Sequence, residues 1–277
     1  MMCPQLLLHF YQTAQPVSIA ARWCDTLPVL SYKPASDAQT ALRWGMQHFA
    51  QRRFDKALKN FEAALQTYTR DQNLVGVGKS LNGLSAVYLE AQEYERSLAY
   101  SQASVSVLED TGTPEDLALA VYQLGVSHLQ LANLSEAEYY LDQALTRYNA
   151  LGDVLNENRV VLHLGLLYAQ RQEFMFALAC YESVLDDLLK FPFQETQALV
   201  LEVLSLILRL SEATGHTTLE TAPSKKLVEY YSDKGYAANI AEIFQQLGKF
   251  HESQTRYGLA FECYAHALQT IPPVQLA

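Results

Sequence analysis

Two sequence patterns recur together at an interval of 40 residues, and this repetition constrains the fold of the 277-residue chain more than any other feature. The segment FDKALKNFEAAL, which begins at Phe54, is followed at that interval by YERSLAYSQASV, LSEAEYYLDQAL and FMFALACYESVL. YGLAFECYAHAL has the same form near the C-terminus. A small residue occupies the same position in each segment: Ala57, Ser97, Ala137, Ala177 and Ala260. A fixed period of this length is typical of an array of similar structural units.

A second pattern precedes each of these segments in the same phase. It reads ALRWGMQHF, LNGLSAVYL, VYQLGVSHL, VLHLGLLYA and FQQLGKFHE. Apolar residues stand three and four positions apart in both patterns, which is the spacing of one face of an α-helix. The turns between the two patterns, such as EAQE and QLAN, are short and polar. Each unit is therefore predicted to be a pair of antiparallel helices.

Small residues also mark the middle of each first helix. They are Gly45, Ser85, Gly125, Gly165 and Gly248. Glycine inside a helix costs about 1 kcal/mol relative to alanine, so its recurrence predicts a close approach of the two helices of a pair. The alanines of the second helix would face this point. Bulky residues one turn later would fill the remaining space: Phe61, Leu141, Tyr181 and Tyr264.

These motifs resemble the tetratricopeptide repeat, whose signature places tryptophan, leucine, glycine and tyrosine on the first helix and alanine and an aromatic residue on the second. VLHLGLLY supplies Leu164, Gly165 and Tyr168, and ALRWGMQHF supplies Trp44 and Gly45. The 40-residue interval is similar to the long-helix varieties found in kinesin light chains and adaptor-type regulators. The resemblance implies an all-α fold, a right-handed superhelical solenoid of about six antiparallel helix pairs.

The regularity of the repeats divides the chain into four parts. Residues 1–37 match no repeat and are interrupted by prolines; their apolar strip LLLHFY would either cap the array or lie on a membrane surface. Residues 38–187 hold four regular repeats. Residues 188–240 would form a degenerate repeat with a flexible loop, GHTTLETAPS, and residues 241–277 a C-terminal repeat and tail.

Composition excludes several classes of protein. The formal net charge of −10 and the pI of about 5.2 argue against a nucleic-acid-binding surface, which needs a basic stripe. The four cysteines show no C-x-x-C spacing, which favours a reducing compartment. No apolar run reaches the roughly 20 residues that span a bilayer, and the N-terminus is a poor signal peptide. We expect a cytoplasmic protein without an integral membrane span.

When the sequence is aligned to the repeat, the candidate catalytic and metal-binding motifs either fall at helix positions or lack residues that the chemistry needs. NLVGVGKS ends like a phosphate-binding loop, but Asn73 stands where the first glycine belongs and a helical segment replaces the preceding strand. Lys79 is then in the first turns of a first helix. His48, His128 and His251 share a repeat position with tyrosines, which predicts helix packing. Cys263 and His266 lack a second pair of ligands. We predict a non-catalytic protein with no cofactor and no metal site.

The resemblance to tetratricopeptide repeats implies that a partner binds along a concave groove lined by the first helices. Extending the phase of the repeat gives eleven groove residues: Met46, Phe49, Lys79, Asn82, Leu89, Tyr122, Val126, Leu129, Arg159, Leu162 and Leu166. Lys79, Asn82 and Arg159 would be the polar anchors. The polar set with which relatives grip a chaperone C-terminus is absent, because Ala86 and Val126 stand at two of its positions.

This largely apolar strip suits an amphipathic helix or an apolar segment of a partner protein. We therefore expect a scaffold or adaptor. Two alternatives are an assembly factor or co-chaperone for a multi-subunit complex, and a regulatory protein that responds to a peptide. Because a long apolar groove is seldom left bare, residues 1–37 or a second copy of the chain would otherwise cover it, the latter by self-association.

Overall fold

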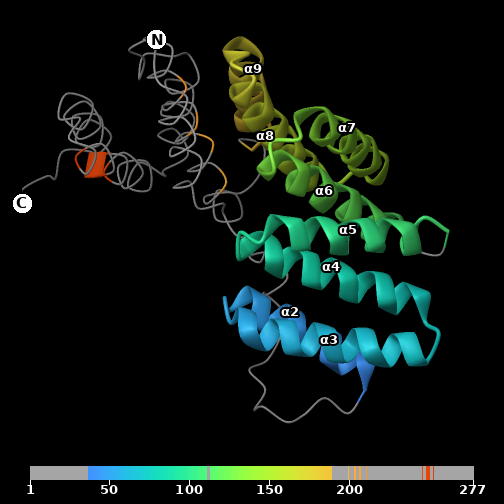
Figure 1. Cartoon of the computed structure of the whole chain (residues 1–277). Helices are drawn as coiled ribbons and strands as arrows, with labels where there is room; N and C mark the ends of the chain where they lie inside the picture. Colours follow the sequence, from blue (N-terminus) through green and yellow to red (C-terminus); the bar gives the residue numbers. More distant parts are fainter. Residues whose placement is uncertain are drawn as a thin grey trace, which may run out of the picture. The chain divides into compact units, whose positions relative to one another are not determined.

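The computed structural model describes residues 37–110 and 113–188 (Figure 1). Single helical positions are also described at 199, 203, 206, 210, 245, 248, 249 and 252. The chain divides into two compact units, residues 1–167 and residues 168–277. The predicted cap, the degenerate repeat with its loop, and the C-terminal repeat lie outside the continuously described ranges.

The described ranges form helices and contain no strand, so the predicted all-α fold is confirmed for them. The helices are α2 (Ala38–Ala50), α3 (Phe54–Arg70), α4 (Leu74–Glu90), α5 (Tyr94–Leu108), α6 (Pro114–Gln130), α7 (Leu134–Leu151), α8 (Val154–Gln170) and α9 (Phe174–Leu188). The four second helices begin at the first residue of each recurring segment. We call α2, α4, α6 and α8 the first helices, and α3, α5, α7 and α9 the second helices.

Each first helix begins at a side-chain cap. Asp37 accepts a hydrogen bond from the Thr40 amide, Asn73 from the Gly76 amide and Thr113 from the Asp116 amide. Asp153 accepts from the amide three residues further along, at the start of α8. Such caps satisfy amides that the first turn of a helix leaves without a partner. The caps therefore fix the residue at which each pair starts.

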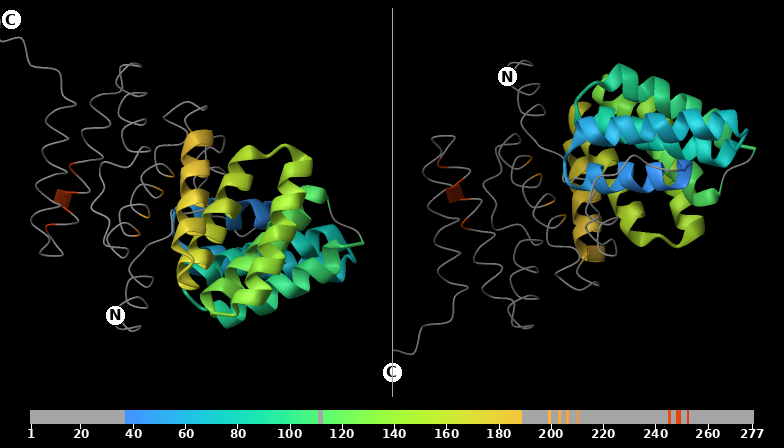
Figure 2. Two further views of the ribbon diagram at one scale, coloured as in Figure 1. Left: turned by 90° about the horizontal axis from the view of Figure 1, so that it is seen from above. Right: turned by 90° about the horizontal axis from the view of Figure 1, so that it is seen from below.

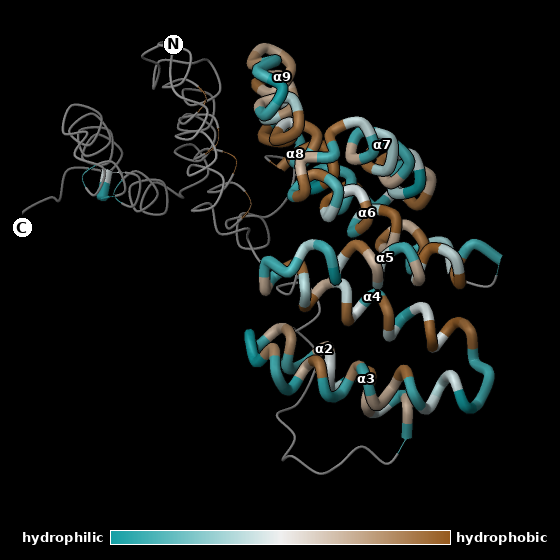
Figure 3. Tube along the Cα trace, in the orientation of Figure 1, coloured by the Kyte–Doolittle hydropathy of each residue, from teal (hydrophilic) through white to brown (hydrophobic). Residues whose placement is uncertain are grey.

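The turn inside each pair relies on backbone geometry instead. Arg52, Gln92, Ala132 and Gln172 all have a positive φ, between 55° and 64°. In the first turn the Arg52 and Arg53 amides donate to carbonyls of the last turn of α2, and the other three turns repeat this arrangement. This is the pattern of a Schellman motif, which usually has glycine at the left-handed position. The turn that joins one pair to the next, between α3 and α4, is hydrophilic (Figure 3).

Within residues 1–167 the helices form two layers. α4 packs against both α2 and α6, so these first helices lie side by side. α3 packs between α2 and α4, and α5 packs between α4 and α6. Figure 2 shows the same helices from above and from below. The first helices are the more buried layer, and α6 is buried continuously from Val121 to Leu129. In the second unit, α9 buries Tyr181, Val184 and Leu185.

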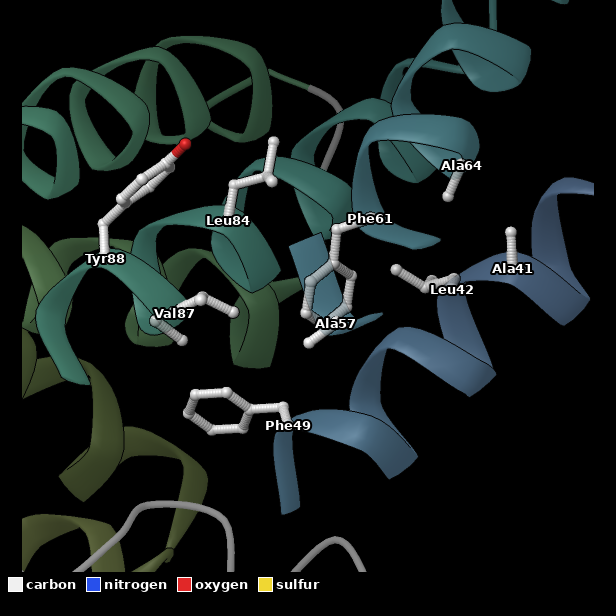
Figure 4. Packing of buried hydrophobic residues seen from close by; sticks show 10 residues of the cluster. Ala41, Leu42, Phe49, Ala57, Phe61, Ala64, Leu84, Val87 and Tyr88 are labelled. Atoms are coloured by element: carbon white, nitrogen blue, oxygen red, sulfur yellow. The ribbon is translucent and has the colours of Figure 1, made fainter. Parts of the chain in front are cut away.

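Phe61 of α3 is the central residue of the first core cluster. It lies between Leu42 of α2 and residues of α4, including Leu84 and Val87 (Figure 4). An added Cβ on Gly45 of α2 or Gly83 of α4 would stand 2.6 Å or 2.5 Å from the ring of Phe61. The predicted close approach is thus present, but the nearest residue to the glycine is the bulky aromatic rather than the alanine.

None of the helices within the described residues is long and apolar enough to cross a membrane.

Candidate functional site

The predicted groove residues lie on first helices, and in residues 1–167 these helices are neighbours. The structure nevertheless separates the eleven residues into two groups. Six are buried inside the protein: Phe49, Asn82, Tyr122, Val126, Leu129 and Leu162. Five keep part of their surface accessible: Met46, Lys79, Leu89, Arg159 and Leu166. We call these five the accessible first-helix residues.

The buried apolar members of the set face neighbouring helices. Phe49 belongs to the core cluster around Phe61, with its ring centroid 6.0 Å from that of Phe54. Leu129 and Leu162 are each only 1% exposed. A partner could not touch these three side chains unless the helices moved apart. Their assignment as contact residues is therefore corrected to a role in helix packing.

Asn82 is an internal connector and not an open anchor. Its Nδ2 donates to the carbonyl of Asp116 at 2.9 Å, and its Oδ1 accepts from the hydroxyl of Ser104 at 2.7 Å. Its own carbonyl accepts from the Gln123 side chain at 3.2 Å. A buried amide with these bonds is satisfied by the protein itself. Asn82 joins α4 to α5 and α6.

Tyr122 is the centre of an aromatic cluster between α6, α7 and α8. Its ring stands edge-on to Tyr148 and to His163, at centroid distances of 6.5 Å and 5.4 Å. Nδ1 of His163 lies 2.9 Å from the Arg159 carbonyl, an acceptor, so this nitrogen carries the proton. Burial lowers the pKa of His163 and raises the pKa of Tyr148. Both side chains are therefore neutral at pH 7.

The two predicted cations are accessible but already engaged. Nζ of Lys79 lies 3.3 Å from a carboxylate oxygen of Asp116, and the Lys79 side chain is 37% exposed. This ion pair joins α4 to α6. Arg159 donates to the side chain of Asn156 at 3.1 Å, within the first turn of α8. Each cation can still reach a ligand, since neither side chain is buried.

The phosphate-loop-like segment has a packing explanation. Asn73 caps α4, and the following residues form its first turns. A Cβ on Gly76 would stand 2.4 Å from the Tyr68 ring, and one on Gly78 would stand 2.4 Å from Leu108. Both glycines therefore allow a second helix to approach closely. Lys79 points to a carboxylate of the neighbouring first helix, as described above.

At His128 the histidine position is a packing position. His128 stacks on Tyr140 at a centroid distance of 5.4 Å, just as Tyr88 stacks on Tyr100 at 5.3 Å. Burial lowers the pKa of His128. His251, Cys263 and His266 lie outside the described residues.

Glu90 was not among the predicted residues, although it ends α4. Its side chain is only 6% exposed and lies 3.8 Å from Arg52, which is largely in solvent. Burial raises the pKa of Glu90, and Arg52 opposes this effect. The period of the sequence does not distinguish a buried glutamate at a helix end from the exposed glutamates of the turns.

Replacing Glu90 with glutamine should raise the melting temperature at pH 7. The folded protein holds the Glu90 proton to a higher pH than the unfolded chain, so the stability contributed by this group falls as pH rises from 4.5 through the folded pKa. Glutamine removes the buried charge, and the lost ion pair with a solvent-exposed arginine contributes little. Thermal unfolding at several pH values measures this effect, which should vanish near pH 4.

Glu95→Gln is the matched control, because Glu95 is exposed on α5. This substitution should leave the melting temperature unchanged at pH 7 and near pH 4. A lower melting temperature for Glu90→Gln at pH 7 would show that the ion pair outweighs the cost of burying the charge.

Comparison with known proteins supports this description of the repeats. Residues 36–110 match the sequence model of the tetratricopeptide repeat family. No curated protein shows significant sequence similarity to the chain.

Three solved structures illustrate the shared fold. NprR in complex with its cognate peptide NprX has a TM-score of 0.57 at 12% identity, with 98% of this chain and 73% of NprR covered. The Rap conjugation regulator of plasmid pLS20 in complex with the Phr* peptide has a TM-score of 0.51 at 14% identity, with 90% of this chain and 80% of the Rap regulator covered. A putative kinesin light chain of Podospora anserina with TPR-like repeats has a TM-score of 0.55 at 12% identity, with 71% of this chain and 95% of the kinesin light chain covered.

At these identities the structural likeness establishes the fold alone. It agrees with the family match and with the 40-residue interval seen in the helix bounds. Residues 36–110 are therefore similar to the tetratricopeptide repeat family, and the described helices that follow recur at the same 40-residue interval.

Proposed function

We propose that this protein binds a peptide, or a short segment of a partner protein, along its first helices and acts without catalysis. The accessible first-helix residues would supply the contacts. Met46, Leu89 and Leu166 offer apolar surface, while Lys79 and Arg159 offer positive charge. This combination fits a segment with apolar side chains and at least one acidic group. The observation that carries the proposal is that these five side chains, two of them cationic, each keep part of their surface accessible on the first helices of a repeat fold.

The peptide complexes of NprR and of the plasmid-encoded Rap regulator support a peptide as the partner. They share the fold across most of this chain, which is an argument from analogy rather than from a shared site. They also favour a peptide-responsive regulator over the scaffold expected from the sequence. A role as an assembly factor and a cytoplasmic location remain predictions from sequence.

A peptide selected from a random library tests the proposal. The purified full chain is used to select binding peptides, and fluorescence anisotropy then measures the dissociation constant of the tightest one. Lys79→Ala and Leu166→Ala should each weaken binding by about tenfold, as expected when a contact worth about 1.4 kcal/mol is lost. Tyr122 and Leu162 are unsuitable for this test because their replacement would disturb the core.

Lys59→Ala is the matched control, since Lys59 is exposed on the second helix α3. It should leave the dissociation constant within about twofold of wild type, as for residues outside an interface. Selected peptides whose affinity is unchanged by both first-helix substitutions would refute the assignment of the groove.

Self-association through the same residues is the competing outcome. It predicts that the chain is a dimer or larger at micromolar concentration and that Leu166→Ala shifts it toward the monomer. Light scattering coupled to size-exclusion chromatography distinguishes this result from binding of a peptide to a monomer.

A further inference from the structure

The second helix α5 differs from its counterparts in the residues that it buries. Three buried serines, Ser97, Ser101 and Ser104, stand on the face that packs against α4 and α6. At the same three repeat positions the other second helices bury mainly apolar residues: Ala57, Ala137 and Ala177; Phe61, Leu141 and Tyr181; Ala64, Ala144 and Val184. Leu108 is the only fully buried large apolar side chain of α5. The change is greatest at Ser101, where a large side chain is replaced by a small polar one.

Hydroxyl groups join α5 to its two neighbours. The Ser97 hydroxyl donates to the Ser85 carbonyl of α4 at 3.1 Å and lies 2.9 Å from the Ser127 hydroxyl of α6. The Ser104 hydroxyl lies within hydrogen-bonding distance of the Gly78 carbonyl, at 3.0 Å, and of the Asn82 side chain, at 2.7 Å. We call Ser85, Ser97, Ser101, Ser104 and Ser127 the serine seam. It lies mainly between the two helices of the second pair and reaches α6 of the third pair through Ser97 and Ser127.

The space beside Ser101 is filled differently from the space beside Phe61. The Phe61 ring lies against Gly45 and Gly83, whose equivalents 40 residues on are Ser85 and Gln123. Polar side chains on α4 and α6 thus stand where glycines make room for the aromatic ring in the first pair. Gln123 is 1% exposed, and its Oε1 has no hydrogen-bond partner among the described residues.

Apolar burial and hydroxyl hydrogen bonds respond differently when a helix moves outward. A buried phenylalanine or leucine loses its favourable environment as water enters. A serine hydroxyl exchanges its protein partner for water, and the net loss is small. The Ser101 hydroxyl is bonded to the Ser97 carbonyl of its own helix at 2.9 Å, so it keeps that bond when α5 moves as a unit.

We propose that α5 is the opening point of this helical array. It separates from α4 and α6 more readily than α3 and α7 separate from their neighbours, because the serine seam replaces the apolar anchor of the other pairs. The seam thereby forms a joint inside the second pair, and Ser97 extends it to α6 of the third pair. This inference goes beyond the proposed function, since it concerns the motion of the array and requires no ligand.

Hydrogen exchange of the wild-type full chain, followed by mass spectrometry, tests the proposal directly. Peptides from α5 are compared with peptides from α7, the second helix of the next pair, after correction for intrinsic rates. Amides of α5 should exchange about tenfold faster or more, as expected for a segment with a lower free energy of local opening. Equal or slower exchange in α5 would refute the proposal, whatever the behaviour of any variant.

A pair of variants attributes the effect to the seam. Ser101→Leu combined with Gln123→Ala restores a large residue facing a small one, as in the first pair. Gln123→Ala alone is the control, because it creates the space without filling it. The double variant should slow exchange in α5 by about tenfold relative to this control. If α5 exchanges equally fast in both variants, the seam does not control opening and the proposal fails.

Discussion

Replacing Phe61 with alanine should lower the free energy of unfolding by about 3–5 kcal/mol, the range found for a large aromatic removed from a packed core. The ring is only 2% exposed and lies in a cluster built by α2, α3 and α4. Alanine would lose the transfer free energy of the ring and leave a cavity that three helices cannot close without bending. Urea denaturation followed by circular dichroism measures the loss.

Phe176→Ala provides the control for this substitution, because Phe176 is also a phenylalanine on a second helix but is 64% exposed. Its replacement should change the free energy of unfolding by no more than about 0.5 kcal/mol. A Phe61→Ala cost similar to that of the control would mean that the core cluster does not hold the first two pairs together.

Gly83→Ala, which adds a single methyl group, should destabilise the protein as long as Phe61 is present. The new Cβ would stand 2.5 Å from the ring, and the same edge of the ring already contacts α2 at Gly45. The ring therefore has little room to move aside. Overpacking of this kind costs about 1–3 kcal/mol, which outweighs the gain of about 1 kcal/mol from alanine in a helix.

The same substitution should become neutral or stabilising in a Phe61→Ala background. The methyl group would then enter the cavity, and only the gain in helix propensity would remain. A double-mutant cycle measured by denaturation should give a coupling energy of about 1–3 kcal/mol between the two positions. Equal costs of Gly83→Ala in both backgrounds would show that the ring is not the obstacle.

The helices could be predicted from the sequence because their signals are local. The four recurring segments begin at Phe54, Tyr94, Leu134 and Phe174, and the second helices begin at the same residues. Small residues at one interval also predicted the close approach of paired helices. The spacing of apolar residues three and four positions apart depends on the geometry of a single helix, so it can be recognised without knowledge of the neighbouring pairs.

The accessible surface could be predicted only in part. An apolar residue on a first helix can face the groove, the second helix of its own pair or the neighbouring pair. Phe49, Leu129 and Leu162 have the spacing of groove residues, yet they pack between helices. The sequence alone does not reveal how far each first helix is rotated, because that rotation depends on contacts between residues far apart in the chain.

The turns also carried little signal in the sequence. Arg52, Gln92 and Ala132 adopt the left-handed conformation that usually favours glycine. Their common position became visible only once the helices on either side were placed. Two members of the serine seam, Ser85 and Ser97, could be recognised in the sequence as small residues at repeat positions, but the hydrogen bonds of the seam depend on side-chain directions from three helices.

The ion pair between Lys79 and Asp116 makes any acidic partner a competitor of the chain's own carboxylate. A ligand that reaches Lys79 exchanges one carboxylate for another, so the number of charges neutralised at this position does not change. Its binding there should depend less on ionic strength than binding to a bare lysine. The exchange would also release the Asp116 carboxylate from Lys79, so that binding of the ligand and this one link between α4 and α6 become a single equilibrium, while Asn82 keeps its bond to the Asp116 carbonyl.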